Sequence, residues 1–462
     1  MKKLEWERLL TKERQRKSGT AEKKYYDRND FEADYDRIVG CSSVRRLQDK
    51  AQVFPLQEND FTRTRLTHSL EVSALARSIG KNIGKRLEHT GEFQPSMTEE
   101  LSALLQTVGL IHDLGNPPFG HYGESVIRNW FDDWFKNSKM TISLSDQQRK
   151  DFLYFDGNVQ NIRIVTKLQM LNDQYGANFT YATLATLIKY PWNSLNAEPP
   201  KYKYGYFQSE SDIIKEIFEA TGLEDGIRHP ATFLLEATDD IIYCCDDIED
   251  GVKKGCINWE IEYLNIKKIF KGKKYQRIYN KIEEDQKRQI VDMELSDKRA
   301  ANVHNFRNYM QGYLFNCAID EFIKQYEDIM NGEYKNELLD TEKELCQYLK
   351  NITRRSCYND KEVLRLELVG DTVLKSLLDI YVNALLYAND INDIKNYEGK
   401  LYSLISSNFK LINKFGYKSG NLINFENLSM HNKLHLIVDY ISGMTDTYAV
   451  NLYKQFAGIS LP

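Results

Sequence analysis

The sequence predicts one large all-α domain. Apolar residues recur mostly at intervals of three and four, the spacing of a helix face, while alternating β-branched runs are scarce. The composition is that of an ordinary globular protein, with 42% hydrophobic and 28% charged residues and only 9 prolines among 462 residues. The length alone favours about three domains, but no linker rich in Pro, Gly or Ser divides the chain.

Two helices are predicted in the first quarter of the chain. The first, over residues 66–83, carries its apolar face at Leu66, Leu70, Leu75, Ile79 and Ile83. The second is expected to begin at the capping-box pattern Ser96-Met97-Thr98-Glu99. Its core stripe consists of Leu101, Leu104, Leu105, Val108 and Ile111. The stripe ends at His112-Asp113-Leu114-Gly115, and the following Asn-Pro-Pro predicts the end of the helix.

A third strong helix is predicted from Phe233 to Asp250, with Gly251 as its stop, and further helices around 364–386 and 434–456. We expect residues 1–40 to form an N-terminal arm and residues 60–252 to form the core. The lysine-rich residues 253–345 are expected to be a helical elaboration, and residues 346–462 a C-terminal helical region.

Charge and cysteine content narrow the function classes. A net charge of −5 argues against a protein that mainly coats nucleic acid. Lysines at 253–254, 267–268 and 271–274 leave single-stranded DNA conceivable as a modulator, although a solvated face explains them equally well. The chain has no apolar run of membrane-spanning length, and its first residues lack the apolar core of a signal peptide. Seven cysteines without a C-x-x-C pair favour a reduced, cytoplasmic setting.

Four residues suit a metal-dependent hydrolase: His68, the pair His112-Asp113, and Asp239. Two imidazoles and two carboxylates match a divalent cation of intermediate hardness. A lone His-Asp pair is usually a surface dipeptide, and a lone core histidine usually has a structural role. Here the pair ends an apolar stripe, where an unpartnered ionisable group is costly.

Further candidates surround this set. His121 and Glu124 are three residues apart, so on a helix the carboxylate can orient the imidazole for proton transfer. A surface histidine beside a solvated glutamate is the alternative. Arg65 lies three residues before His68, where a guanidinium can bind phosphate. Lys189 could add a second phosphate contact, although an exposed lysine is the default interpretation.

The acidic run after residue 238 has a stripe of its own. Asp239, Tyr243 and Asp247 are spaced at i, i+4 and i+8, and few positions between them are free to face water. This pattern favours a stripe that faces a cleft and could bind a sugar, whereas a solvated acidic face is the usual explanation. The sequence contains no P-loop, dinucleotide-binding or serine-hydrolase motif.

The order His68, His112-Asp113, Asp239 resembles the HD-domain phosphohydrolase superfamily, which has a helical fold. Local motifs are similar to those of bacterial dGTP triphosphohydrolases, and they cover the chain at residues 45–55, 63–72, 112–124, 239–250 and 439–446. This resemblance implies hydrolysis of dGTP, or of other dNTPs, to the deoxynucleoside and tripolyphosphate by water attack at the α-phosphate. It also implies a homo-oligomer, commonly a hexamer.

The resemblance assigns roles residue by residue. His68, His112, Asp113 and Asp239 would hold Mn²⁺ or Mg²⁺, which suit an open shell completed by phosphate and water. His121 would transfer the proton with support from Glu124. The residues expected to contact the substrate are Gln48, Arg65, Lys189, Tyr190, Tyr243 and Asp247. The C-terminal region would complete the substrate pocket.

Two other readings stay open at this point. Another HD reaction, such as that of a phosphodiesterase or nucleotidase, would give phosphate or pyrophosphate in place of tripolyphosphate. A nucleic-acid-binding regulatory protein with a vestigial HD site belongs to a different class, and the filled ligand positions disfavour it.

Overall fold

The structure is a computed structural model that describes residues 3–16, 28–56, 61–137, 143–169, 173–290, 292–386, 388, 391–414 and 422–460. Within these ranges all regular secondary structure is helical, and the extended pairings are three isolated bridges. The all-α prediction is confirmed.

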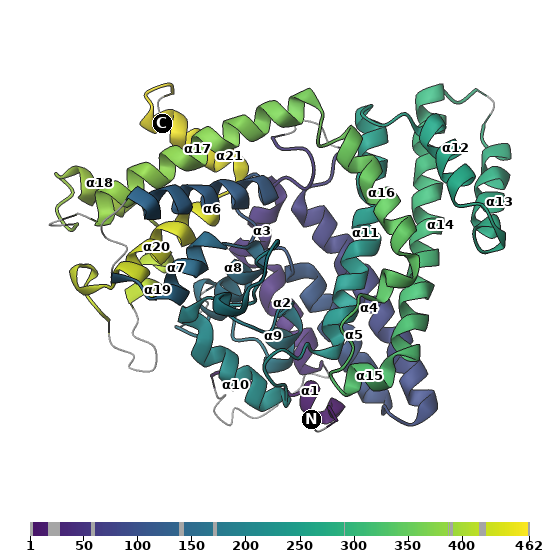
Figure 1. The fold of residues 1–462 in the computed structure, drawn as a ribbon, viewed down its shortest axis with the longest axis horizontal. Coiled ribbons are helices and arrows are strands. Elements are labelled where there is room, and N and C mark those ends of the chain that lie inside the picture. Colours follow the sequence, from purple (N-terminus) through teal and green to yellow (C-terminus); the bar gives the residue numbers. More distant parts are fainter. Residues whose placement is uncertain are drawn as a thin grey trace.

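The first half of the chain supplies eleven of the described α-helices (Figure 1). They are α1 (Trp6–Leu9), α2 (Asp30–Val39), α3 (Ser42–Arg46), α4 (Arg65–Thr90), α5 (Pro95–Ile111), α6 (Gly120–Asn137), α7 (Asp146–Leu153), α8 (Gly157–Arg163), α9 (Tyr181–Leu187), α10 (Ser211–Thr221) and α11 (Pro230–Lys254). Short turns include η1 (Leu47–Asp49), the π-turn η3 (Ile164–Leu168), η4 (Ser194–Asn196) and η5 (Gln208–Glu210).

The second half continues with longer helices, and α17 crosses the top of the molecule in the view of Figure 1. They are α12 (Trp259–Ile269), α13 (Lys273–Lys287), α14 (Leu295–Lys324), α15 (Tyr326–Met330), α16 (Lys343–Ser356), α17 (Lys361–Leu386), α18 (Tyr397–Leu404), α19 (Ser407–Lys414), α20 (Met430–Ser442) and α21 (Asp446–Phe456), with turns η6 (Leu338–Glu342) and η7 (Phe425–Asn427).

The helices α4, α5 and α11 form the centre of the fold. Helices α4 and α5 approach closely because small residues face each other. A Cβ added at Gly109 of α5 would lie 2.8 Å from the Cα of Ser73 on α4. Helix α11 packs against both. This close packing brings the beginning of α4 next to the end of α5.

Two details of the predicted helices are wrong. Helix α5 begins at Pro95 with Gln94 as its N-cap, and no side chain caps it, so the hydroxyl of Ser96 does not serve as a cap. Proline suits this first position because its φ is already helical. The core stripe from Leu101 to Ile111 is fully buried, as predicted. On α4, however, Leu70 is 44% exposed, because the buried face follows His68, Val72, Ile79 and Ile83, and Leu70 lies off that face.

Helix α11 extends beyond its predicted stop. Gly251 lies inside the helix, where an added Cβ would be 2.6 Å from the sulfur of Cys357, so this glycine serves close packing. The helix ends at Gly255, whose φ of +84° is the left-handed conformation that glycine adopts without strain. The helix expected around 364–386 is α17, while 434–456 is divided into α20 and α21.

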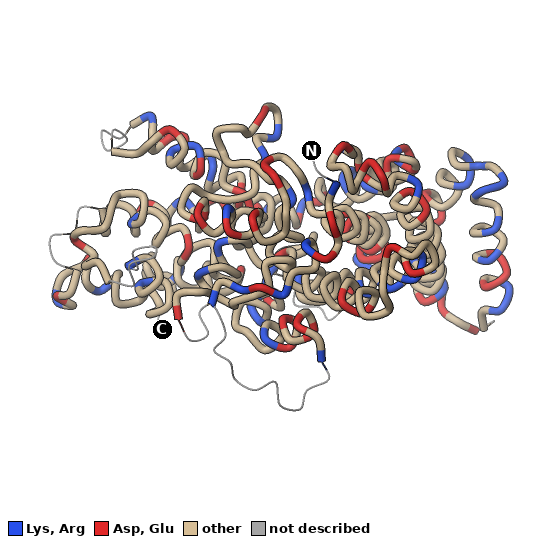
Figure 2. Tube along the Cα trace, turned by 90° about the horizontal axis from the view of Figure 1, so that it is seen from below, with Lys and Arg blue, Asp and Glu red and all other residues tan. Residues whose placement is uncertain are grey.

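Residues 253–345 contain the helices α12 to α15, and α12 and α13 lie at the right edge of Figure 1. Several of their lysines are paired with carboxylates: Lys253 with Glu249 at 3.0 Å, Lys254 with Glu362 at 3.1 Å and Lys274 with Glu342 at 2.8 Å. Basic and acidic residues are intermixed over the molecule (Figure 2). These three lysines are therefore neutralised within the chain, and the role of single-stranded DNA stays a prediction.

Residues at the N-terminus pack against the body of the protein, since Trp6, Leu9 and Phe31 are buried. Among the described residues, none of the helices is long and apolar enough to cross a membrane.

Candidate functional site

Three elements bring His68, His112 and Asp239 together. Thr64 caps α4 and places His68 in its first turn, while His112 is the C-cap of α5 and Asp239 lies midway along α11. Oδ1 of Asp239 lies 3.1 Å from Nε2 of His68 and 3.5 Å from Nε2 of His112. The ligand atoms of all three lie within 4.8 Å of one another, a spacing at which they could hold one metal ion.

The donor set fits a divalent cation. Nδ1 of His112 lies 2.9 Å from the carbonyl oxygen of Gly109, which can only accept, so Nδ1 carries a proton and Nε2 is the nitrogen whose lone pair a neutral imidazole would offer to a metal ion. That Nε2 is buried and has no hydrogen-bond partner among the described residues. Buried polar atoms are rarely left in this state, and a metal ion is the usual partner of such an imidazole nitrogen.

Carboxylates control the charge of this histidine. Burial lowers the pKa of His112, but the carboxylates of Asp113 and Asp239 raise it more, to about 9. The site therefore attracts positive charge, from a proton or from a cation.

Asp113 lies beside this group. Its Oδ2 accepts a hydrogen bond from Arg65 at 2.5 Å, and its Oδ1 accepts one from Asn116 at 2.7 Å. Oδ1 is 3.8 Å from Nε2 of His112. Burial raises the pKa of Asp113, but Arg65 and His112 outweigh burial and hold it well below its ordinary value. Asp113 is therefore charged at this site, and its role as a ligand stays a prediction.

His121 and Glu124 form the expected pair in the first turns of α6. Nδ1 of His121 lies 3.3 Å from Oε2 of Glu124, whose Oε1 accepts a hydrogen bond from the amide of Gly157 at 2.8 Å. Glu124 is buried, whereas the His121 side chain is 78% exposed. The hydrogen bond to Glu124 raises the pKa of His121, and the charges of Arg65 and Asp113 also act on it. The pair therefore lies beside the HD doublet with its imidazole open to solvent.

The residues that hold the HD loop were missed by sequence reasoning. The ammonium of Lys50 donates to the carbonyl oxygen of Asn116, and Asn161 donates to the carbonyl of His112 at 2.9 Å. Asp446 accepts from the amides of Phe119 at 2.9 Å and Ala51 at 3.0 Å. Apart from Asn161, these residues lie in the motifs at 45–55, 112–124 and 439–446, but the sequence assigned them no role because their partners come from distant parts of the chain.

The predicted substrate contacts have different surroundings in the structure. Lys189 lies near Tyr190 and 3.6 Å from Glu236, which outweighs the effect of burial and raises the pKa of Lys189. The charge of Asp239 acts on Lys189 as well, so this lysine lies toward the metal group. Gln48, by contrast, is exposed and lines another pocket together with Thr64 and Asp446.

On α11, the hydroxyl of Tyr243 lies 2.6 Å from that of Tyr358, a residue that the sequence did not single out. Asp247 is buried, and its Oδ2 has no partner in the described part of the chain. Burial holds the pKa of Asp247 well above its ordinary value.

The rest of the acidic run does not face a cleft. Arg63 pairs with Asp246 at 3.2 Å, Glu249 at 2.7 Å and Asp250 at 2.5 Å. Arg307 pairs with Glu249 as well, at 2.8 Å. These carboxylates join α11 to the segment before α4, and they lie off the predicted stripe of Asp239, Tyr243 and Asp247.

The helical fold and the His, His-Asp, Asp set define an HD-domain phosphohydrolase. A profile of the HD domain matches residues 65–159, and a profile of a phosphohydrolase-associated domain matches residues 423–455. The chain is 37% identical to a deoxyguanosinetriphosphate triphosphohydrolase-like protein of Listeria monocytogenes, over 99% of this chain and 100% of the relative.

Two other relatives extend this comparison. A protein of the same description from Pseudomonas aeruginosa is 33% identical over 99% of this chain and 100% of its own length. The deoxyguanosinetriphosphate triphosphohydrolase of Yersinia enterocolitica is 30% identical over 95% of this chain and 96% of its own. The chain therefore belongs to the dGTP triphosphohydrolase family of HD-domain proteins, and it is a hydrolase of that superfamily.

Proposed function

We propose that this protein hydrolyses dGTP, or dGTP together with other dNTPs, to the deoxynucleoside and inorganic tripolyphosphate. The observation that carries the proposal is that the ligand atoms of His68, His112 and Asp239 lie close together, and that the buried Nε2 of His112 has no hydrogen-bond partner among the described residues. The names of the full-length relatives support dGTP as the substrate.

The ligands of the cation would be His68, His112, Asp113 and Asp239, with Mn²⁺ or Mg²⁺ as the ion. When bound, the cation supplies charge neutralisation at the α-phosphate and lowers the pKa of a water molecule. Arg65 already neutralises Asp113, and its guanidinium is buried at the same site, so a phosphate that enters would share it.

In the proposed reaction the water oxygen bonds to the α-phosphorus and the bond from phosphorus to the 5′ oxygen breaks. The leaving 5′ oxygen needs a proton. His121 can deliver it from Nε2, because Nδ1 is held by Glu124 and the raised pKa of His121 favours its protonated form. Glu124 is itself fixed by the amide of Gly157. No phosphorylated enzyme is required.

Two sets of residues near the metal ligands would recognise the substrate, one for the triphosphate and one for the sugar. Lys189 and Tyr190 would contact the triphosphate, and Tyr243 and Asp247 would bind the deoxyribose from one stripe of α11. Gln48, which is exposed in the neighbouring segment η1, would contact the sugar as well. A homo-oligomer, hexameric by resemblance, and modulation by single-stranded DNA belong to the same proposal.

Product analysis tests the proposal. The purified protein is incubated with Mn²⁺ or Mg²⁺ and with each of the four dNTPs and GTP separately, and the products are resolved by ion-exchange chromatography. We expect deoxyguanosine and tripolyphosphate from dGTP, with GTP intact. Orthophosphate or pyrophosphate would instead indicate a different HD reaction, and metal binding without turnover would favour a regulatory role.

A further inference from the structure

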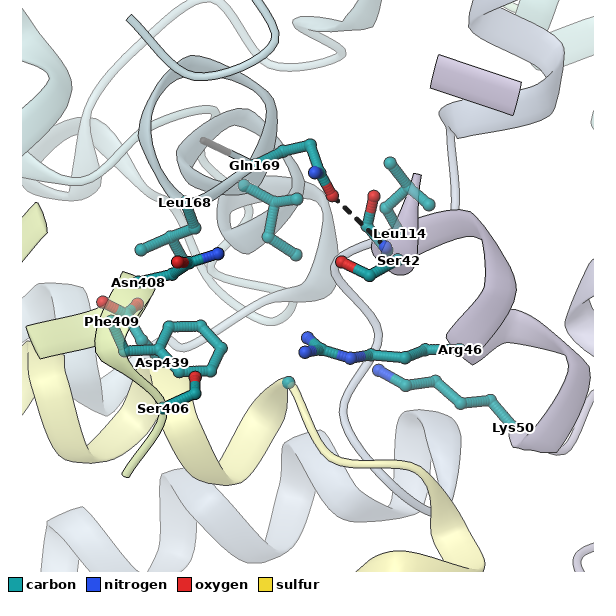
Figure 3. A pocket seen from close by; sticks show the side chains of 13 residues that line it. Ser42, Arg46, Lys50, Leu114, Leu168, Gln169, Ser406, Asn408, Phe409 and Asp439 are labelled. Carbon is teal, nitrogen blue, oxygen red and sulfur yellow. Dashed lines mark hydrogen bonds between the residues drawn. The ribbon is translucent and has the colours of Figure 1, made fainter. Parts of the chain in front are cut away.

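A small polar cavity lies behind the HD loop, between α3, η3, α19 and α20 (Figure 3). Its volume is about 40 Å³, several times the ~10–15 Å³ that one water molecule requires on this measure. Leu114, the residue after the HD doublet, forms part of its wall. The cavity can therefore hold a compact group of a few heavy atoms.

Arg46 extends into this cavity without a carboxylate partner. In Figure 3 its guanidinium points from α3 toward Phe409, and the guanidinium carbon lies 5.8 Å from the centre of that ring. Within the described part of the chain, this guanidinium forms no hydrogen bond or ion pair with another side chain. Burial lowers the pKa of Arg46, and the neighbouring Arg45 lowers it further. The ring orients the guanidinium and leaves its N–H groups free to donate.

The other charged residues of the lining leave the cavity positive. The ammonium of Lys50 is buried and donates to two carbonyl oxygens, one of them that of Ser442 at 3.1 Å. Asp439 is the acidic residue of the lining, and Arg163 binds both of its oxygens at 2.7 Å. Burial lowers the pKa of Lys50 to about 7, and the nearby carboxylate of Asp446 opposes that effect. Arg46 is therefore the lining residue whose permanent charge has no carboxylate partner within the described ranges, and an anion in the cavity would balance it.

Neutral donors complete the lining. The hydroxyl of Ser43 is buried and has no partner among the described residues. The side-chain oxygen of Gln169 accepts from the Ser43 amide at 3.2 Å, so its NH₂ group is left to donate. Asn408 lies exposed at the rim. A guanidinium, a hydroxyl and amide groups around a few-atom cavity are suited to a tetrahedral oxyanion.

We propose that this cavity is a binding site for a phosphate group, separate from the metal centre, with Arg46 as its principal ligand. The phosphate is either free orthophosphate or the end of a polyphosphate chain. The proposal goes beyond the hydrolytic function and does not depend on it. Lys50 connects the site to the HD doublet, because it donates to the carbonyl of Asn116, and the side chain of Asn116 donates to Asp113.

Calorimetric titration of the metal-free full chain with orthophosphate, and separately with tripolyphosphate, tests the site. Metal-free protein excludes turnover, so the result is independent of any activity, and the Arg46→Gln variant distinguishes this cavity from the phosphate contacts of the metal centre. We expect one phosphate per chain in the parent protein. Arg46→Gln should weaken binding at least tenfold, because it removes a charge-assisted hydrogen bond. Arg45→Gln is the matched control: this neighbour is exposed, donates to the carbonyl of Gly40 and should bind as the parent does.

A second variant guards against misfolding of Arg46→Gln. Asn408→Asp keeps Arg46 and adds a carboxylate at the exposed rim, where it should pair with the guanidinium and weaken phosphate binding similarly. Tighter binding of tripolyphosphate than of orthophosphate would support recognition of a chain end, and equal or weaker binding would support free phosphate.

Three results would overturn the proposal. The first is that the parent protein binds no phosphate up to about 10 mM. The second is that the parent, Arg46→Gln and Asn408→Asp bind phosphate equally. The third is that the parent binds no phosphate and Arg46→Gln has a changed sedimentation coefficient. The last result would assign Arg46 to a contact between copies of the chain.

Discussion

Two halves of the acidic stretch on α11 can be compared residue by residue. In the first half, Asp239 faces the imidazoles of His68 and His112. In the second half, Glu249 and Asp250 face the guanidinium of Arg63. A guanidinium is always charged and saturates carboxylates, whereas neutral imidazoles can share a cation with them. The first half is therefore a candidate metal site, and the second half is an ion-pair cluster that holds α11 against the segment before α4.

Asp239→Ala should have the largest effect, since it removes the carboxylate that faces both imidazoles. We expect activity to fall below detection and Mn²⁺ binding, measured by calorimetry, to be lost, with little change in helical content. The neighbour Asp240, which pairs with Lys350 at 2.8 Å, provides the control. Asp240→Ala should retain metal binding, and an active Asp239→Ala protein would contradict the metal assignment.

His121→Ala should lower kcat by about 10²–10⁴-fold, the usual contribution of a general acid, while Mn²⁺ binding is retained. His89→Ala, an exposed histidine at the end of α4, serves as the control. Unchanged kcat in His121→Ala would remove this residue from the mechanism.

The pH profile sharpens this assignment. Because the hydrogen bond to Glu124 raises the pKa of His121, the acid form persists to higher pH, and kcat should fall as pH rises through that pKa. Glu124→Gln should move this alkaline limb to lower pH. A limb at the same pH in both proteins would assign the titration to another group.

Arg63→Ala tests the structural half of the comparison. It leaves Asp246, Glu249 and Asp250 buried without their main cation, so we expect a loss of about 3–5 kcal/mol in the free energy of unfolding, measured by urea denaturation. Arg86→Ala on α4 is the control, because Arg86 pairs with Asp320 in a largely exposed position and should cost under about 1 kcal/mol. Similar losses in both variants would mean that the Arg63 cluster does not hold α11 against that segment.

Asn116→Ala should have the smallest effect. Asn116 orients Asp113 through a 2.7 Å hydrogen bond, and removal of such an outer partner typically costs about 10–100-fold in metal affinity or activity. Asn82→Ala, on the exposed side of α4, should leave both quantities unchanged. An equally unaffected Asn116→Ala protein would show that Asp113 needs no orienting partner.

Much of the fold could be predicted because helix periodicity is a local property. The buried stripe of α5 and the long helix α17 follow directly from the spacing of apolar residues. Helix ends were less predictable. Gly251 and Gly255 look alike in the sequence, yet the first lies against Cys357 inside the helix and the second ends it. The difference depends on a neighbour more than one hundred positions away.

The sequence by itself determined the all-α class and the chemical types of the candidate ligands, since both depend on residue identity and local spacing. Only the tertiary structure decided which carboxylates remain available. Asp239 lies beside two histidines, whereas Asp250 pairs with Arg63, although both aspartates belong to one acidic run. It also placed Gln48 at an exposed position, in the lining of a pocket that includes Thr64 and Asp446. The physical reason is that a side chain's partner is set by the packing of other helices, which the spacing along its own helix does not encode.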